Sequence, residues 1–530
     1  MGTKQHSNYE SLITFTRASK GHALRPVSYG DELVTNGTFD TDTSSWTAFA
    51  ADLSVSGGEL VVTNNATAFG RGYQGVTTEV GKLYQFSCDV NYTGDAGRIR
   101  LGTTSAGNEI YEQQSIAEDK TVVVNFVATT TTTYIRLGLQ ANTNGHSIQF
   151  DNASVKEVLF DQPDGTLTLF EHPDNVPRVE YDADGNRLGL LVEESRTNLF
   201  RESEKLSEKD HDMSTSDNAA IAPDRNQTAS FCKPTTFSTE HYIDDAGVTA
   251  GTDYAVSCFA KQGPGDYLLA FRGSGIGSNP PRFNLATGTI DNEGASSAWS
   301  NTKIEDVGNG WYRCSSIANP SSTTPLRFQV VRSDGAHSFA GDGTSGLYIW
   351  GCQIEQASFL TSYIKTTGST ATRSADVASI PVADFGYNQS EGTLFIEAQG
   401  NGDSTNFRRF MNLQDGSTNA RWEIMGDTAS DVRMRHHNGS AVDVNKDVLS
   451  DVLDGSTMFK MAYAIKDNDA AASGDGGTVV TDTSVDFCVP TVMYIGSGSV
   501  GASDFLCGHI KSIKYYPRRL TNAQLQEITS

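Results

Sequence analysis

The chain alternates apolar and polar residues over short stretches, and runs that could form a long amphipathic helix are almost absent. Around residue 135, Ile135, Leu137 and Leu139 alternate with polar residues and glycine, and Ile99 and Leu101 alternate with arginines. A period of two predicts strands with one buried face. About eight such segments within residues 31–157, with Gly, Asn or Asp between them, predict a β-sandwich or jelly roll.

The same pattern continues to the end of the chain. Residues 81–88 and 251–258 share Gly, Tyr, Ser and Cys at a constant offset, which indicates a second sandwich related to the first. Strand-like segments from about residue 375 predict a third sandwich, and Thr521 is placed to cap a short final helix. The predicted fold class is therefore all-β: several antiparallel β-sandwich (jelly-roll) domains in tandem and one short C-terminal helix.

Composition and charge exclude several classes of protein. The 51 glycines and 19 tyrosines favour strands and turns, and the net charge of −24 argues against a nucleic-acid partner and against anionic membrane surfaces. No apolar run reaches 18 residues, so no membrane insertion is expected. The seven cysteines contain no CxxC pair, which predicts buried thiols rather than a zinc site or a disulfide framework.

The stretch YDADGNRLGLLVEE (181–194) resembles a calcium loop at Asp182, Asp184 and Asn186. Such a loop requires glycine at its sixth position, where this chain has Arg187, and it requires flanking helices. Asp-Gly between two extended runs is instead a hairpin signal, with Gly185 at positive φ. The stretch is predicted to be a hairpin turn.

Recognisable catalytic motifs are missing from the sequence. It contains no HExxH, no GxSxG and no Walker lysine, and its 64 acidic residues do not single out a pair for glycoside hydrolysis. The expectation from the sequence is that the chain is not an enzyme.

Two separated segments resemble a family. NVPRVEYDADGNRLGLLVEESRTNLF (175–200) and ITFTRASKGHALRPVSYG (13–30) resemble elements of tailed-bacteriophage virion proteins of the tail-fibre and head-fibre type. In that family the two elements follow one another, whereas here a sandwich separates them. The resemblance implies a connector made of 1–30 plus 158–200, with 31–157 inserted into it. A second jelly roll over 201–374 and a last sandwich over 375–530 would follow.

The sandwiches carry resemblances of their own. LVTNGTFDTDTSSW and FDNASV, at the two ends of the inserted module, resemble family 4/9 carbohydrate-binding modules, and GHIKSIKYYPRRLTNAQLQEI resembles laminin-G/concanavalin-like domains. The first resemblance implies a possible structural calcium held in part by Asp151. It also implies sugar binding on an outward sheet face. The candidate residues for that face are Tyr73, Arg98, Arg100, Tyr134, Arg136 and Gln140, and a solvated sheet face is the alternative interpretation.

The resemblances together imply a structural protein on the surface of a tailed-phage particle, as a tail fibre, head fibre or decoration. It would be assembled in the cytoplasm of the host bacterium, contact other virion proteins of the capsid or tail, and bind host-surface polysaccharide by multivalent lectin-like adhesion. Such fibres are commonly homotrimers. Two alternatives remain: a purely structural component that binds only neighbouring virion proteins, and a capsule depolymerase.

Overall fold

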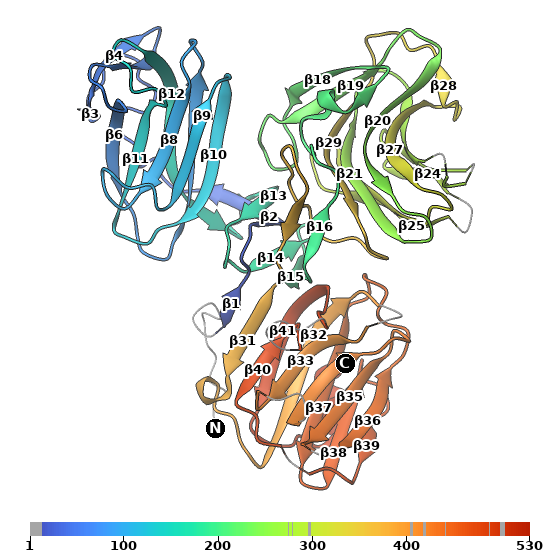
Figure 1. Cartoon of the computed structure of the whole chain (residues 1–530). Helices are drawn as coiled ribbons and strands as arrows, with labels where there is room; N and C mark the ends of the chain where they lie inside the picture. Colours follow the sequence, from blue (N-terminus) through green and yellow to red (C-terminus); the bar gives the residue numbers. More distant parts are fainter. Residues whose placement is uncertain are drawn as a thin grey trace. The chain divides into compact units, whose positions relative to one another are not determined.

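The structure is a computed structural model of the chain, and it divides into two compact units (Figure 1). It describes residues 13–530 apart from 274, 278, 295–297, 403–405, 417–419, 440, 487 and 499–503. The smaller unit is Pro26–Thr166, and the larger unit contains the chain on either side of it. Antiparallel sheets build both units, which confirms the predicted all-β class. The four-part division of the chain remains a prediction.

The smaller unit is a sandwich of two sheets whose inner faces form one core. The apolar positions that predicted it, Ile99, Leu101, Ile135 and Leu137, are fully buried. One sheet has the order β3 (Thr47–Phe49), β6 (Arg71–Thr77), β11 (Thr132–Leu139), β8 (Gly97–Gly102), β9 (Tyr111–Ile116). The other contains β10 (Lys120–Val127), β7 (Leu83–Asn91), β12 (Ser147–Phe160), β4 (Ala51–Ser56) and β5 (Glu59–Asn64), with the last residues of β2 (Gly21–Tyr29) paired to β12.

The larger unit contains two sandwiches, of which the first follows residue 200. One of its sheets has the order β17 (Asp210–His211), β20 (Thr239–Val248), β27 (Thr324–Arg332), β22 (Tyr267–Arg272), β23 (Pro281–Asn284), β24 (Thr289–Glu293), with β28 (Ser338–Phe339) beside β20. The other has the order β18 (Met213–Ala220), β19 (Ala229–Pro234), β29 (Leu347–Glu355), β21 (Tyr254–Gln262), β26 (Trp311–Ala318), β25 (Trp299–Asp306).

Segments from both ends of the larger unit complete its C-terminal sandwich. One sheet has the order β1 (Thr14–Thr16), β31 (Val377–Pro381), β40 (Val492–Ile495), β33 (Arg408–Gln414), β34 (Ala420–Gly426), β35 (Val432–Asn438), β36 (Val442–Leu449). The other has the order β14 (Arg178–Tyr181), β15 (Arg187–Val192), β41 (Gly508–Tyr516), β32 (Glu391–Gly400), β37 (Phe459–Lys466), β38 (Asp469–Gly474), β39 (Val480–Asp482). Phe15 and Val192 pack in the core of this sandwich. Strands β1, β14 and β15, from the two segments that resemble the phage family, thus complete the C-terminal sandwich, with β1 and β14 at sheet edges.

The predicted hairpin and final helix of the larger unit are confirmed. β14 and β15 form an antiparallel hairpin, and Gly185 in its turn has a φ of 78°. Asp182 accepts a hydrogen bond from the backbone N–H of Asn186, as in a turn. The final helix α1 (Asn522–Thr529) follows Thr521, whose side chain caps it.

All seven cysteines are buried free thiols. Within the described part of the chain, no helix is long and apolar enough to cross a membrane.

A buried ion network joins segments of the larger unit that are distant in sequence. Arg178 pairs with Glu193 at 2.8 Å and with Asp376 at 2.5 Å. Arg17 pairs with the same aspartate at 3.1 Å, and Arg373 pairs with the same glutamate at 3.0 Å. None of these five side chains is more than 5% exposed. Ion pairs in such surroundings depend on every member, because a charge left without its partner is costly to bury.

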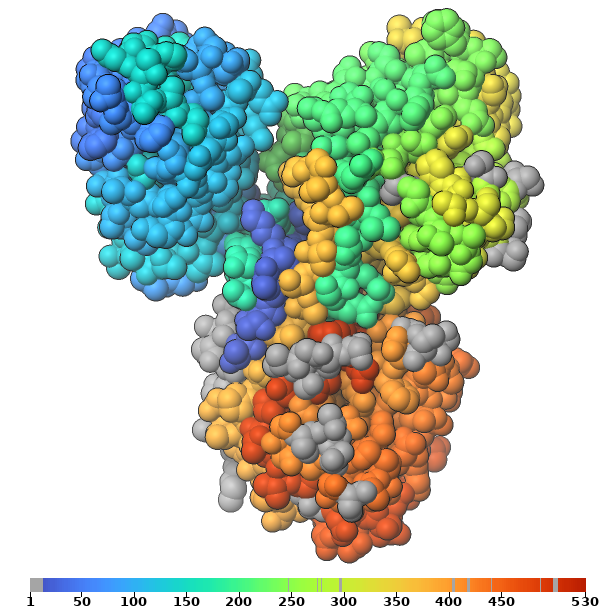
Figure 2. Space-filling model, in the orientation of Figure 1, coloured from blue at the N-terminus to red at the C-terminus, as the bar shows by residue number. Residues whose placement is uncertain are grey.

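Three of the five members of this network come from the segments that carry the phage resemblance. Arg17 belongs to ITFTRAS, Arg178 to NVPRVEY and Glu193 to GLLVEE, while Arg373 and Asp376 belong to TRSAD. Figure 2 shows the blue N-terminal residues of the unit against green and orange segments, and two strand pairs, β1 with β31 and β16 (Arg196–Asn198) with β30 (Ala371–Arg373), connect these parts. In this chain the charged residues of the motif therefore hold the connector together.

Candidate functional site

The predicted sugar-binding residues lie on the outer face of the five-stranded sheet in the smaller unit. Strand β11 runs between β6 and β8, and Arg136 stands opposite Tyr73 on one side and Arg100 on the other. Arg98 lies two residues before Arg100 on the same face of β8. Because cross-strand neighbours are only about 5 Å apart, these four side chains form one continuous group.

Tyr134 and Gln140 extend this group along β11 in both directions. Tyr134 lies between Gly75 and Gly102, so neither neighbouring strand has a side chain beside it. Gln140 follows the end of β11, and its side-chain amide donates to Gln114 at 3.4 Å. The structure thus brings all six predicted residues to one face.

One predicted feature of this face is different in the structure. The period-two pattern placed Arg136 outward into solvent, whereas its side chain is only 5% exposed. It points away from the sandwich core as predicted, but a loop covers it, and its guanidinium donates to the carbonyl oxygens of Ala106 and Gly107 at 2.6 and 2.9 Å. Sequence periodicity gives the side of a sheet on which a residue lies, and it does not show which loops fold over that side.

Phe49, Phe69 and Arg71 also belong to this face, and they were not predicted from the sequence. Phe49 on β3 stands opposite Arg71 on β6, and the Arg71 guanidinium carbon lies 3.8 Å from the Phe49 ring centroid. The corresponding carbon of Arg98 lies 5.1 Å from the ring centroid of Phe69. Both phenylalanines are exposed, at 48% and 43%. Arg71 alternates with Tyr73 along one strand, so the period-two pattern could have placed it on this face.

One carboxylate balances two of the arginines on this face. Oε1 of Glu112, on β9, accepts hydrogen bonds from Arg98 at 2.8 Å and from Arg100 at 2.5 Å. Its other oxygen accepts from Asn108 at 2.6 Å. Burial raises the pKa of Glu112, but hydrogen bonds from Arg100 and Asn108 outweigh this effect, so the net pKa lies below its ordinary value. Glu112 is therefore a fixed negative charge that holds two guanidiniums in place.

The predicted metal ligand, Asp151, lies on the other sheet of the smaller unit. Asp151 stands directly opposite Asp89 in the pairing of β12 with β7. The Asn152 amide donates to both carboxylates, at 3.1 and 2.8 Å. Burial raises the pKa of Asp151, and the nearby carboxylates of Asp89 and Asp40 raise it further. Three acidic groups thus crowd this point of the sheet.

Another acidic group lies in the C-terminal sandwich. Carboxylate oxygens of Asp427, Asp431 and Asp447 lie within 4.8 Å of one another. Arg433 pairs with Asp427 at 2.8 Å and also with Asp447. Since Arg433 already balances part of the negative charge, we interpret the three aspartates and this arginine as an ion-pair cluster.

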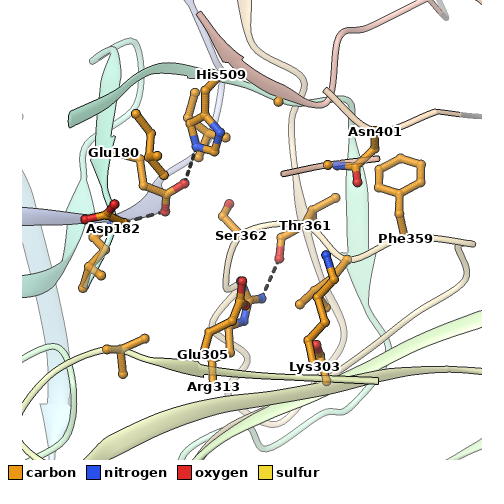
Figure 3. A pocket seen from close by; sticks show the side chains of 18 of the residues that line it. Glu180, Asp182, Lys303, Glu305, Arg313, Phe359, Thr361, Ser362, Asn401 and His509 are labelled. Atoms are coloured by element: carbon orange, nitrogen blue, oxygen red, sulfur yellow. Dashed lines mark hydrogen bonds and ion pairs between the residues drawn. The ribbon is translucent and has the colours of Figure 1, made fainter. Parts of the chain in front are cut away.

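The larger unit contains a cavity of about 460 Å³ with mixed polar walls (Figure 3). Glu180 from the hairpin points toward His509, and the two side chains are 2.6 Å apart. Arg313 donates to the carbonyl oxygen of Thr361 at 2.6 Å. The remaining labelled lining residues are Asp182, Lys303, Glu305, Phe359, Ser362 and Asn401. Its walls come from segments distant in sequence, which explains why sequence patterns did not indicate it.

Comparison with known proteins finds similarity in structure only. No protein-family model matches the chain, and no curated protein matches it. Among solved structures, the CBM40 module of a Ruminococcus gnavus sialidase, bound to α2,3-sialyllactose, matches 27% of this chain and 84% of its own, with 14% identity and a TM-score of 0.24. A tandem CBM22 domain from Paenibacillus barcinonensis Xyn10C matches 62% of this chain and 98% of its own, with 13% identity and a TM-score of 0.21.

A third comparison corrects the expectation that the chain is not an enzyme. Trypanosoma rangeli sialidase matches 96% of this chain and 94% of its own, with 9% identity and a TM-score of 0.24. Because this structural neighbour is an enzyme, the expectation that the chain is not an enzyme is withdrawn. Identity and TM-score at this level assign no reaction or substrate to the chain.

Proposed function

We propose that this chain is a surface protein of a tailed-phage particle and that its smaller unit binds host-surface polysaccharide. The virion part of the proposal rests on the resemblance of residues 13–30 and 175–200. The binding part is carried by one observation: Tyr73, Arg100 and Arg136 stand side by side across three strands, with Phe49 and Phe69 exposed at the edge of the same group.

The chemistry of this face suits a sugar ring. Aromatic side chains present flat apolar surfaces to the C–H groups of a pyranose, while guanidiniums donate paired hydrogen bonds with fixed geometry. Tyr73 and the exposed Phe69 supply rings, and Arg98 and Arg100 supply planar donors held by Glu112. The Tyr134 ring lies against Gly75, where a Cβ would come within 3.1 Å of it, and the residue remains partly exposed.

The particle supplies the remaining parts of the proposal. Many copies on one particle raise the avidity of a weak site without new contacts. A homotrimer that contacts capsid or tail proteins and is assembled in the bacterial cytoplasm is proposed from the family resemblance alone.

Calcium at Asp151 is proposed as well. A divalent cation would neutralise the crowded carboxylates of Asp151, Asp89 and Asp40, and carboxylates are its usual ligands.

The test uses the purified chain and surface polysaccharide from a susceptible bacterium. We expect the polysaccharide to retain the chain, and Tyr73→Ala to weaken retention roughly five- to tenfold because it removes one stacking surface. Tyr92→Ala is the matched control, since Tyr92 is 40% exposed and follows β7 of the opposite sheet. No retention by any sample would refute the adhesive role and favour a purely structural one. Reducing ends released in the same tube would identify a depolymerase.

A further inference from the structure

The smaller unit gathers all its arginines at one place. Residues 26–166 contain four arginines, Arg71, Arg98, Arg100 and Arg136, and we call these four the arginine cluster. The same residues include three lysines and 17 acidic side chains, which gives the unit a net charge of −10. In a strongly acidic domain, a group of four guanidiniums within one sheet face is a local reversal of charge. An anion is attracted to such a place even while the rest of the surface repels it.

The arginine cluster surrounds a small hollow of about 20 Å³. The remaining lining residues are Phe69, Gly70, Gly138 and Leu139, so none of the lining side chains is a carboxylate. Gly138 forms the floor: a Cβ at that position would lie 2.4 Å from the carbonyl oxygen of Gly70 and 2.7 Å from Cβ of Arg71. The hollow has room for one small group, such as a carboxylate oxygen, and not for a whole sugar ring.

The guanidinium donors around the hollow are only partly used. Nε of Arg136 is buried and has no hydrogen-bond partner, although its Nη1 is occupied by two carbonyl oxygens. Nε of Arg71 is also buried without a partner. Arg98 and Arg100 share a single oxygen of Glu112. Buried arginine Nε atoms elsewhere in the chain, such as that of Arg178, also lack a partner, but those of Arg71 and Arg136 belong to residues that line a hollow, where an acceptor from solvent can reach them.

Electrostatics supports the same conclusion. Burial lowers the pKa of Arg136, and the neighbouring Arg71 and Arg100 lower it further, to about 10. Burial and Arg100 lower the pKa of Arg71 as well. Each shift records the free-energy cost of crowding like charges away from water. An anion in the hollow would lower that cost, because it would supply the negative charge and the acceptors that Glu112 alone does not provide.

We propose that the arginine cluster binds the carboxylate of an acidic polysaccharide, with the adjoining sugar ring against Phe69 and Tyr73. This inference rests on the proposed polysaccharide-binding function and names the substrate class of that site. Guanidiniums match a carboxylate with paired N–H groups, and Arg–carboxylate geometry is frequently bidentate. Specificity for acidic over neutral polymers follows, because a neutral sugar would leave the same donors unpaired.

Affinity electrophoresis of the full chain in polygalacturonate tests this inference. We expect the polymer to retard the chain, and the carboxyl-reduced polymer, which keeps the sugar rings as neutral alcohols, to retard it about tenfold less. Arg71→Gln should weaken binding by a similar factor. Arg71 donates a long side-chain hydrogen bond, of 3.5 Å, to the carbonyl oxygen of Phe69, so little of the fold depends on it and the fold should survive the substitution. Lys120→Gln removes the same charge from exposed Lys120 on the opposite sheet and should leave binding unchanged.

The outcomes separate this inference from the proposed function. Equal retardation by the native and reduced polymers, or an Arg71→Gln variant that binds like Lys120→Gln, would overturn the role of the carboxylate. Retardation by dextran sulfate and not by polygalacturonate would assign the hollow to sulfate instead. If bacterial polysaccharide retains the chain while polygalacturonate does not, the acidic-sugar inference alone fails. If neither polymer binds, both proposals fail.

Discussion

The net charge of the buried ion network in the larger unit predicts which of two substitutions destabilises that unit more. The network contains three guanidiniums and two carboxylates, so its net charge is +1. Arg178→Met leaves it neutral, whereas Asp376→Asn leaves it at +2. Burial and the neighbouring Arg178 lower the pKa of Arg17 to about 10, whereas burial of Arg178 is outweighed by Asp376 and Glu193, which raise the pKa of Arg178. We therefore expect Asp376→Asn to destabilise the unit more than Arg178→Met does.

The contacts set the magnitude of each loss. Arg178 donates four hydrogen bonds, to the His22 carbonyl oxygen, Ser362, Glu193 and Asp376. Breaking a buried ion pair costs about 3–5 kcal/mol, mostly because a charge is left without compensation. After Arg178→Met, each carboxylate still contacts another arginine, which places this variant near 3 kcal/mol, at the lower end. Asp376→Asn takes a partner from two arginines at once, which places it near 5 kcal/mol.

Urea unfolding of the full chain, followed by tryptophan fluorescence, measures both losses. Four of the five tryptophans (Trp299, Trp311, Trp350 and Trp422) belong to the larger unit, so the signal reports mainly on that unit. Arg332→Gln is the control, because Arg332 is half-exposed and pairs with Asp334 at the surface, where ion pairs contribute little. The reasoning is refuted if Arg178→Met unfolds like the control, or if Asp376→Asn is the milder of the two variants.

Three further predictions concern other parts of the chain. If Asp151 holds calcium, a chelator should lower the melting temperature of the smaller unit by mass action, and Asp151→Asn should remove this response; an unchanged melting curve of the native chain would exclude calcium. Burial would raise the pKa of Glu193, but Arg373, Arg178 and Ser362 outweigh it and hold the pKa well below 4.5. Its contribution to stability is thus complete above about pH 4.5 and declines as the pH falls further, so the urea midpoint should fall on acidification and Glu193→Gln should flatten that dependence. Thr521→Ala should cost about 1 kcal/mol in urea unfolding, because Thr521 and Gln524 form a capping box; a loss below about 0.3 kcal/mol would contradict this role.

Periodicity predicted the fold class because the alternation of apolar residues is itself the consequence of a sheet with one buried face. Ile135, Leu137 and Leu139 were placed in the core on that ground, and they are at most 1% exposed. The hairpin could also be predicted from a local signal, because an Asp-Gly pair between two extended runs was enough to place the turn at Gly185, which has a positive φ. Periodicity could not show that β1 and β15 complete the sheets of the C-terminal sandwich, because strand pairing across hundreds of residues leaves no local signal.

The candidate site was predictable to the extent that it follows strand register. The alternation of apolar and polar residues predicted that Arg98 and Arg100 share one face of their strand, and that Tyr134 and Arg136 share one face of theirs. Antiparallel pairing of the two strands brings these residues together. Glu112 was missed since its strand, β9, is mostly polar and half-exposed and shows little alternation. The hollow could not be predicted from the sequence either, because its floor depends on the close approach of Gly138 to the backbone of Gly70.

The chain uses arginine in two ways, and the difference lies in solvent access and in the source of acceptors. In the larger unit, Arg178 and its partners are at most 5% exposed, and protein atoms accept from both Nη groups, so no dissolved anion can reach or is needed there. In the arginine cluster, Arg98 and Arg100 keep 11% and 17% of their side chains exposed and share one carboxylate oxygen. A cluster built only for stability would supply its own counter-charges, as the buried network nearly does. Nε of Arg178 also lacks an acceptor but is fully buried, so the access of unpaired donors to a hollow is the feature that distinguishes a binding face from a structural one.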